Sequence, residues 1–433
     1  MSARPLSRPP VRRVLIECTD TYRSNWNTGI QRVVRNVVRE SAAVGAEYGV
    51  ECRPIIRVGN RYRAVRWKAR IARREWKWVR RVKQLRLDPE LWDRNDLFRV
   101  IHRVAVRIRK IFYPRAVVRK LRDISWSLRG EEIVPGEGDT LVMLDAWWNL
   151  DVWSGVEQAK QNGVTIGVVM YDLLPVTHPE YFHSSIIVPF TKSLSTALHH
   201  ADYFVAISHT VCATLQDYVF RAGHLRLRDP ARYSFFRLGS ALDIASQKKR
   251  VREEVREAFG RGRDRNPYLC VGTIEPRKNH VLLLDAFEQV WKTYPDAQLC
   301  LVGRVGWLCE GLLARIWQHP RYNQSLFMFN DLSDAEPTFC YRNAKAFLFP
   351  SHAEGFGLPV VEALQYGLRV MVSDIPIHRE VGRDYCAYFD LEEPGSLAAM
   401  IGDLERSGSF PHVRRPDEFV LYDWAESTRD FIS

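Results

Sequence analysis

The sequence has no apolar run that reaches the ~18 residues needed by a membrane-spanning helix. Its first 13 residues are rich in arginine and proline and contain no apolar core, so we expect no signal peptide. With 46% hydrophobic residues over 433 positions, the composition is that of a globular protein. The length favours two domains over one.

The sequence also lacks paired cysteines. Its eight cysteines are isolated, with no Cys-x-x-Cys and no metal-like cluster of cysteine and histidine. This pattern predicts free thiols in a reducing compartment, so we expect a cytoplasmic protein without a metal site. The cysteines are Cys18, Cys52, Cys212, Cys270, Cys300, Cys309, Cys340 and Cys386.

Positive charge is concentrated in one segment. The net charge is +12, yet residues 61–130 hold 23 Lys and Arg against six Asp and Glu, a balance of +17 that leaves −5 for the rest. Tryptophans and aliphatic residues recur among these cations at partly helical spacing. We predict a basic helical insertion at about 60–130 that contacts an anionic membrane surface, with a solvated insertion as the alternative. Nucleic acid is not an expected partner, because no recognisable nucleic-acid module accompanies the charge.

Strands and helices alternate in two series along the chain. This alternation predicts an α/β protein with two Rossmann-like domains facing a central cleft. We place one domain at 1–242, the second at 243–415 and a terminal helix at 416–433. The expected strands are 14–18, 140–144, 164–170 and 203–207 in the first series, and 268–271, 297–302, 326–329, 346–349 and 368–372 in the second.

The segment 351–364 is the most informative stretch of the chain. It follows an apolar strand and opens a helix at about Pro359, with Glu354, Gly355 and Gly357 between the two. Bare glycines let a ligand approach the backbone, and a helix N-terminus offers unpaired N–H groups to an anion. Glu362 lies about two turns into the helix. The strand, the glycine loop, the helix N-terminus and the two carboxylates together suit a phosphorylated, polyhydroxylated ligand. The alternative is a turn whose glycines serve packing alone.

A second loop carries adjacent cations. Gly272 ends the first strand of the second series, and Arg277 and Lys278 precede the next helix, where they suit a diphosphate. The alternative is a solvated basic loop. Weaker candidates for the same ligand are the strand-end pair Gly303 and Arg304.

Other polar groups follow strands of both series. Asn330 ends a strand of the second series, and Gly29 precedes the first helix; for both, an ordinary turn is the alternative. Acceptor-binding candidates in the first series are Asp145, Trp147, Tyr171, Asp172 and His178. Core packing competes for the tryptophan, and a histidine beside proline is often structural.

Together these motifs resemble family-4 retaining glycosyltransferases. The resemblance rests on Ser-x-x-Glu-Gly-Phe-Gly-Leu-Pro-x-x-Glu-Ala at 351–363 and on the loop 268–280, and it covers most of 14–431, least so 55–135. It implies a GT-B fold, a terminal helix that crosses back to the first domain, and metal-independent transfer from a nucleotide diphosphate sugar with retention.

The resemblance also implies roles for the motif residues. Glu354 contacts hydroxyls of the transferred hexose, Glu362 contacts the ribose, and the loop Gly355, Phe356, Gly357 and Leu358 binds the diphosphate. Two positions depart from the family pattern. Thr273 stands where one common form of the phosphate loop has arginine, so Arg277 and Lys278 are expected to supply the charge. Tyr171 stands where many relatives have histidine, and His178 is the alternative for that role.

The implied function is transfer of a hexose to a lipid-linked or growing surface polysaccharide. The resemblance is to bacterial mannosyl- and rhamnosyltransferases of capsule and O-antigen synthesis, so GDP-mannose is the first candidate donor and no cofactor is expected. We expect a cytoplasmic enzyme held peripherally at the inner membrane. A GT-B sugar-nucleotide epimerase or hydrolase, or an inert glycan- or membrane-binding subunit, are the alternatives.

The basic segment makes the first testable prediction. The protein should sediment with vesicles that contain anionic lipid but not with neutral vesicles, and high salt should release it, because exposed charges are screened by salt. Equal sedimentation with both kinds of vesicle would contradict an electrostatic attachment.

Overall fold

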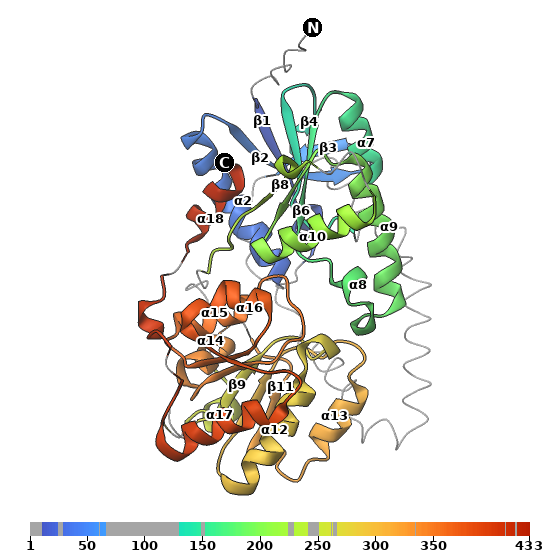
Figure 1. Cartoon of the computed structure of the whole chain (residues 1–433). Helices are drawn as coiled ribbons and strands as arrows, with labels where there is room; N and C mark the ends of the chain where they lie inside the picture. Colours follow the sequence, from blue (N-terminus) through green and yellow to red (C-terminus); the bar gives the residue numbers. More distant parts are fainter. Residues whose placement is uncertain are drawn as a thin grey trace, which may run out of the picture.

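The computed structural model describes residues 11–24, 29–59, 61–65, 130–148, 152–223, 229–240, 251–260, 262, 266–333, 335–411, 413–420 and 422–433. These residues form two α/β domains, each built on its own mainly parallel sheet, with the first domain above the second in Figure 1. The arrangement is the one expected from the two αβ series.

The first domain holds an eight-stranded sheet in the order β4-β3-β2-β1-β5-β6-β7-β8. The six strands from β2 to β8 in that order are parallel neighbours, whereas β3 and β4 add an antiparallel edge. The strands are β1 (Arg13–Glu17), β2 (Glu51–Val58), β3 (Arg61–Ala64), β4 (Glu132–Ile133), β5 (Asp139–Met143), β6 (Thr165–Met170), β7 (Tyr203–Ala206) and β8 (Tyr233–Phe235).

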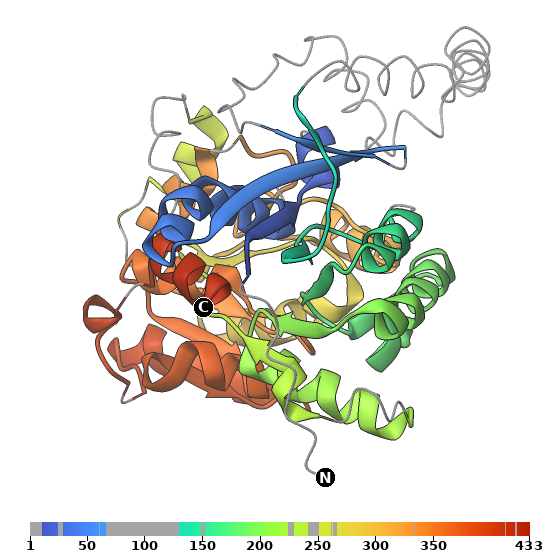
Figure 2. The same cartoon turned by 90° about the horizontal axis from the view of Figure 1, so that it is seen from above.

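Helices follow most of these strands. The long helix α2 comes between β1 and β2, and its valines are buried because they recur at helical spacing on one face. Figure 2 shows the helices on both sides of the sheet. They are α1 (Thr19–Arg23), α2 (Gly29–Glu47), α7 (Trp153–Gln161), α8 (Leu174–Thr177), η1 (Pro179–Tyr181), α9 (Ser184–His200), α10 (His209–Arg221) and η3 (Pro230–Arg232).

The second domain holds a six-stranded sheet in the order β11-β10-β9-β12-β13-β14, and all of its neighbours are parallel. The strands are β9 (Tyr268–Val271), β10 (Leu299–Val302), β11 (Leu326–Phe329), β12 (Phe347–Phe349), β13 (Val370–Ser373) and β14 (Cys386–Phe389). The helices are α11 (Glu253–Ala258), η6 (Pro276–Lys278), α12 (His280–Thr293), α13 (Glu310–Trp317), α14 (Glu336–Asn343), α15 (Leu358–Gln365), α16 (Pro376–Gly382), η7 (Arg383–Tyr385), α17 (Pro394–Ser407) and η8 (Pro416–Glu418).

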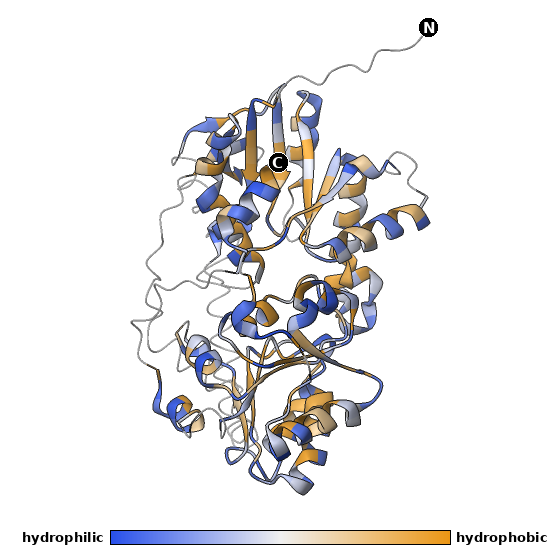
Figure 3. Cartoon of the chain, turned by 60° about the vertical axis from the view of Figure 1, so that its left-hand side comes forward, coloured by the Kyte–Doolittle hydropathy of each residue, from blue (hydrophilic) through white to orange (hydrophobic). Residues whose placement is uncertain are grey.

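The second sheet is buried on both faces. Side chains alternate along β12, so Leu348 joins the cluster under α12 and α17, whereas Phe347 and Phe349 join the cluster under α14 and α15. Hydropathy coloured on the chain shows apolar residues along the strands and on the inner sides of helices (Figure 3). The sheet is thus a rigid platform whose carboxyl edge faces the first domain (Figure 1).

The last helix, α18 (Trp424–Ile432), lies on α2 of the first domain. Arg429 forms an ion pair with Glu47 at 2.8 Å, and Phe431 packs against Phe236 at 5.3 Å between ring centroids. A Cβ added to Gly239 would come within 2.8 Å of the Trp424 ring, so the segment after β8 needs a glycine where it passes the start of α18. Two segments of the chain therefore connect the domains, one after β8 and one before α18.

The predicted strands occur within about two residues of the observed ones. The strands β2, β3, β4, β8 and β14 were not predicted, because they are short or interrupted by polar residues and proline. The predicted helical insertion at about 60–130 is wrong at its start, since Arg61–Ala64 pairs with β2 as a strand, and residues 66–129 lie outside the described part of the chain.

All eight cysteines are free, as predicted, and all are buried. Within the described residues, no helix is long and apolar enough to cross a membrane.

The start of α18 gives a second prediction. Asp423 accepts the backbone N–H of Glu426 at 2.7 Å, and Glu426 accepts that of Asp423 at 2.8 Å. Asp423→Ala should therefore lower the free energy of unfolding by about 1 kcal/mol, measured by urea denaturation. Asp417→Ala removes only an ion pair between two exposed side chains and serves as the control; an equal loss in both variants would contradict the cap.

Candidate functional site

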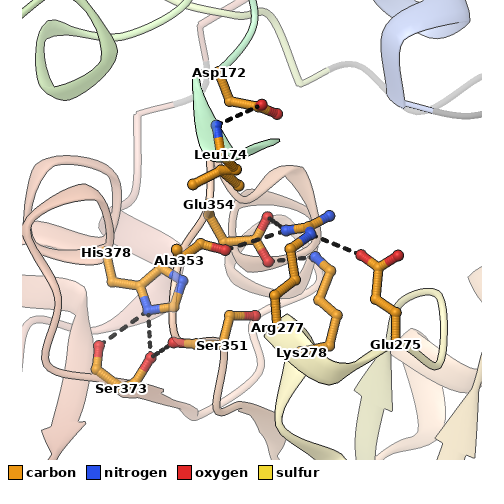
Figure 4. Close-up of polar contacts among 10 residues, drawn as sticks. All are labelled: Asp172, Leu174, Glu275, Arg277, Lys278, Ser351, Ala353, Glu354, Ser373 and His378. Atoms are coloured by element: carbon orange, nitrogen blue, oxygen red, sulfur yellow. Dashed lines mark hydrogen bonds and ion pairs between the residues drawn. The ribbon is translucent and has the colours of Figure 1, made fainter. Parts of the chain in front are cut away.

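The two glycine-containing loops lie together at the carboxyl edge of the second sheet. The loop of 272–279 follows β9 and the loop of 350–357 follows β12, and these strands are neighbours in the sheet. The backbone N–H of His352 donates to the carbonyl of Arg277 at 2.8 Å, which joins the two loops. The predicted residues Arg277, Lys278 and Glu354 are therefore brought together (Figure 4).

Glu354 lies between two cations. Its carboxylate accepts from Arg277 Nη1 at 2.8 Å and, through the other oxygen, from the Lys278 ammonium. The side chains of Glu354 and Lys278 are only 7% and 9% exposed. Burial alone would raise the pKa of Glu354, but the charges of Arg277 and Lys278 outweigh burial and lower that pKa to about 2.

The cations are held in turn by other groups. Arg277 also pairs with Glu275 at 2.7 Å and donates to the Ala353 carbonyl at 3.1 Å. Burial would lower the pKa of Arg277, but Glu354 and Glu275 outweigh it and raise that pKa. Burial lowers the pKa of Lys278, and Glu354 offsets this only in part. The cluster is a preorganised set of buried charges at the carboxyl edge of a parallel sheet.

The loop after Glu354 contacts the first domain. A Cβ added to Gly355 would lie 2.2 Å from the Tyr171 carbonyl, so no side chain fits there, and the Gly355 carbonyl accepts from Ser208 Oγ at 2.9 Å. Gly357 has φ of 88° and precedes α15, a conformation that favours glycine. Of the two glycines that were predicted for ligand approach, Gly355 allows the two domains to meet.

The amino ends of two helices face each other across this contact. Gly29 is the first residue of α2, and a Cβ on it would lie 3.8 Å from Leu358, the first residue of α15. Both helix ends carry partial positive charge from their unpaired N–H groups. Phe356 and Leu358 pack into the apolar cluster beneath α2. An anion at this point would meet two helix N-termini, one from each domain.

The second motif carboxylate is also shared between domains. Glu362 forms an ion pair with Arg32 of α2 at 2.5 Å and accepts from the Tyr341 hydroxyl at 2.9 Å. Glu380 of α16 accepts the backbone N–H groups of His209 and Thr210, at the start of α10, at 2.7 and 2.8 Å. These contacts align the carboxyl edges of the two sheets.

The remaining donor candidates lie on the same edge. A Cβ on Gly303 would come within 1.7 Å of the Gly272 carbonyl, so these loops touch backbone to backbone. Ile274 donates to the Arg304 carbonyl at 2.8 Å, and the Arg304 side chain is exposed. Asn330 directly follows β11, at the far side of the sheet from Glu354.

Three acceptor candidates are buried in the first domain and form hydrogen bonds within it, and their acceptor role stays a prediction. Trp147 is 1% exposed and its indole N–H donates to the Val169 carbonyl at 2.9 Å. Tyr171 is 4% exposed, and its hydroxyl donates to the Leu144 carbonyl at 2.8 Å. Asp145 accepts from Thr21 through both backbone and side chain and so holds α1 against β5.

The other two acceptor candidates face the second domain. Asp172 accepts the N–H of Leu174 at 3.1 Å; burial raises its pKa, and the nearby Arg277 partly offsets that rise. Figure 4 shows its carboxylate above the Glu354 cluster. His178 lies 2.9 Å from Thr177 Oγ1 and stacks with Tyr181, whose ring also stacks with His352 at 5.2 Å between centroids.

Several site residues were not predicted: Glu275, Arg32, Tyr341, Glu380 and the buried group Ser351, Ser373 and His378. Glu275 could have been found, because two adjacent cations in a buried loop require carboxylates nearby. Except for Ser351, which lies in the Glu354 loop itself, the others come from other parts of the chain. Among the described residues, no group of three or more His, Cys, Asp and Glu side chains gathers in a way that could hold a metal ion.

Comparison with known proteins shows which family model and which solved structures the chain matches. Residues 251–415, which contain Arg277, Lys278, Glu354 and Glu362, match the family described as glycosyl transferases group 1. The fold is that of GT-B glycosyltransferases, as predicted: the structure of sucrose-phosphate synthase from Thermosynechococcus elongatus superimposes with a TM-score of 0.53 at 15% identity, covering 96% of this chain and 92% of that one. The Anabaena protein HepE in complex with UDP and glucose gives a TM-score of 0.52 at 12% identity, covering 97% and 94%.

The relatives that the chain resembles in sequence include two mannosyltransferases of Escherichia coli. The serotype-specific mannosyltransferase WbdA of Escherichia coli is 29% identical over 274 residues, which are 63% of this chain and 34% of WbdA. The O-antigen chain mannosyltransferase B of Escherichia coli is 31% identical over 38% of this chain and 44% of its own length. The chain thus resembles GT-B glycosyltransferases of the O-antigen mannosyltransferase type, and it matches about a third of the length of WbdA.

The Glu354 cluster makes a prediction about pH. Because the pKa of Glu354 is about 2 in the folded protein and about 4.3 in an unfolded chain, its ionised form favours folding. That contribution is complete above about pH 4.3 and is lost as the pH falls toward 2. Glu354→Gln should therefore lower the free energy of unfolding by about 3 kcal/mol near neutral pH, because it leaves two buried cations short of a partner.

The same difference should shrink below about pH 4, where Glu354 of the unfolded wild-type chain takes up a proton while Glu354 of the folded protein is still ionised. Urea denaturation of both proteins between pH 7 and pH 3 measures it. A difference that stays constant down to pH 3 would show that Glu354 is not the ionised partner of these cations.

Proposed function

We propose that this protein is a retaining glycosyltransferase that moves a hexose from a nucleotide diphosphate sugar to a glycan acceptor. The observation that carries the proposal is the buried cluster of Glu354, Arg277 and Lys278 beside two facing helix N-termini. It offers cations and N–H groups for a diphosphate and a carboxylate for hydroxyl groups, in one place. The match of residues 251–415 to glycosyl transferases group 1 supports the same reading.

In this proposal, each chemical group of the nucleotide sugar contacts a particular set of residues in the site. The diphosphate lies at the N–H groups of 355–358 and beside Arg277 and Lys278, whose charges would offset the phosphates in place of a metal ion. Glu354 accepts hydrogen bonds from hydroxyls of the transferred sugar. Glu362 accepts from the ribose; its carboxylate oxygens, already bonded to Arg32 and Tyr341, retain lone pairs for that purpose.

The reaction proceeds on one face of the sugar. The bond between the anomeric carbon and the phosphate oxygen breaks while the acceptor oxygen bonds to the same face of that carbon. The acceptor proton passes to the departing phosphate oxygen, so no separate general base is needed. The cations and helix N-termini stabilise the charge that develops on this phosphate.

The first candidate donor is GDP-mannose, and the acceptor is a lipid-linked or growing surface polysaccharide. The relatives named as a serotype-specific mannosyltransferase and as an O-antigen chain mannosyltransferase support this choice. We propose that the protein works at the cytoplasmic face of the inner membrane, where the basic segment of residues 61–130 would contact anionic lipid.

A nucleotide-release assay tests the function. The protein is incubated with a panel of nucleotide sugars, with and without extracted lipid-linked glycan. Release that requires the glycan supports transfer. Release without acceptor would indicate an epimerase or hydrolase, and glycan or lipid binding without release would indicate an inert subunit.

Glu354 provides the matching variant. Glu354→Gln should lower the rate of acceptor-dependent release at least about 100-fold, because an amide cannot accept from sugar hydroxyls with both atoms or neutralise the cations. Glu405→Gln is the control: Glu405 also pairs with a lysine, Lys345, and accepts a hydroxyl, that of Tyr268, but Lys345 precedes the amino end of β12.

Both variants should be assayed under conditions where urea denaturation shows that they remain folded. Equal rates for Glu354→Gln and the wild type would remove Glu354 from the site, and an equal loss in the control would point to stability as the cause.

A further inference from the structure

Three polar side chains are buried together behind the Glu354 loop. Ser351 follows β12, Ser373 ends β13 and His378 lies in α16, and each residue is 0% exposed. Ser373 Oγ donates to the Ser351 carbonyl at 2.6 Å and so holds the ends of the two strands together. Figure 4 shows this group next to Ala353 and Glu354.

The contacts of His378 determine where its ring carries hydrogen. Nδ1 lies 3.0 Å from the Ser373 carbonyl and 3.1 Å from Ser373 Oγ. A carbonyl oxygen can only accept, so Nδ1 must hold the hydrogen. Burial lowers the pKa of His378 to about 4, so the ring is neutral near pH 7. Nε2 is then an acceptor with a free lone pair.

This Nε2 atom is buried and unsatisfied. No hydrogen-bond partner reaches it among the described residues. The adjacent ring atom, Cδ2, lies 3.8 Å from where a Cβ on Gly357 would be, so this edge of the ring borders the glycine loop. Figure 4 shows Nε2 on the side of Ala353 and Glu354. A buried acceptor without a donor destabilises the free protein, which points to a group that arrives later.

We propose that His378 Nε2 accepts a hydrogen bond from a hydroxyl group of the transferred sugar. The inference rests on the proposed function and adds a sugar-binding residue to it. The chemistry selects the ligand group, because the ionised phosphates of a nucleotide diphosphate have no hydrogen to donate, whereas every free sugar hydroxyl has one. Glu354 and His378 then receive sugar hydroxyls from two sides of the same loop.

The test pairs enzyme variants with altered donors. The probes are GDP-mannose and its 2-, 3-, 4- and 6-deoxy analogues, with GDP alone for comparison. The wild type should lose at least about tenfold in kcat/KM with one particular analogue, because Nε2 is left without a donor. His378→Phe should lose a similar factor with GDP-mannose and then be indifferent to removal of that same hydroxyl.

Affinity gives a second readout that needs no acceptor. By calorimetry, His378→Phe should bind GDP-mannose about tenfold more weakly than the wild type but bind GDP equally well. His378→Leu, which is smaller, repeats the test if phenylalanine disturbs folding. His280→Phe is the matched control, since His280 is a buried histidine of the same domain with both ring nitrogens unpartnered among the described residues; it should change all donors by one common factor.

Two results would overturn the inference. If both His378 variants lowered kcat/KM equally for every donor and kept the wild-type sensitivity to each missing hydroxyl, His378 would only support the loop or hold a water molecule. The proposed function would survive that result. If no nucleotide sugar gave acceptor-dependent release with the wild type, the proposed function and this inference would both be wrong.

Discussion

The site depends on the pairing of one buried carboxylate with two buried cations. Glu354 keeps Arg277 and Lys278 charged and in place without water, and the cations keep Glu354 ionised. Removing any one member would leave an uncompensated charge in a region of low dielectric, which costs several kcal/mol, roughly 3–5. The cluster also joins the loops after β9 and β12, so the electrostatic pairing and the loop geometry support each other. Charges arranged in advance of the ligand are what stabilisation of a departing phosphate requires.

The first domain completes this site through close backbone contacts. Gly355 meets the Tyr171 carbonyl, Ser208 meets the Gly355 carbonyl, and Glu362 meets Arg32. The proposed function therefore places two requirements on the glycine loop, which must lie close to a ligand and close to the first domain. Small residues satisfy both demands, because they leave the backbone N–H groups accessible and exclude side chains from the contact.

Much of the fold could be predicted from sequence, because apolar runs such as 268–271 and 326–329 are short, uninterrupted and followed by helical patterns. That Glu354, Arg277 and Lys278 lie together could be predicted too, since they belong to local motifs at strand ends. The packing around the acceptor candidates could not. Asp145, Trp147 and Tyr171 have the chemistry of a sugar site, but only packing decides that Trp147 donates to Val169 and that Asp145 serves Thr21. His378 was not predicted, because its tautomer is set by its contacts with Ser373, which a sequence pattern does not show.

The chain passes between the domains twice, once after β8 and again before α18. A single connection would allow the two domains to move relative to each other in any direction. Two connections restrict this motion, so that the easiest one is a hinge rotation about the line that joins the two connecting segments. Each opening would then separate the same pairs of groups, among them Glu362 from Arg32 and Glu380 from α10, and each closing would restore the same register. Entry of a donor and departure of a nucleotide would follow one repeatable path.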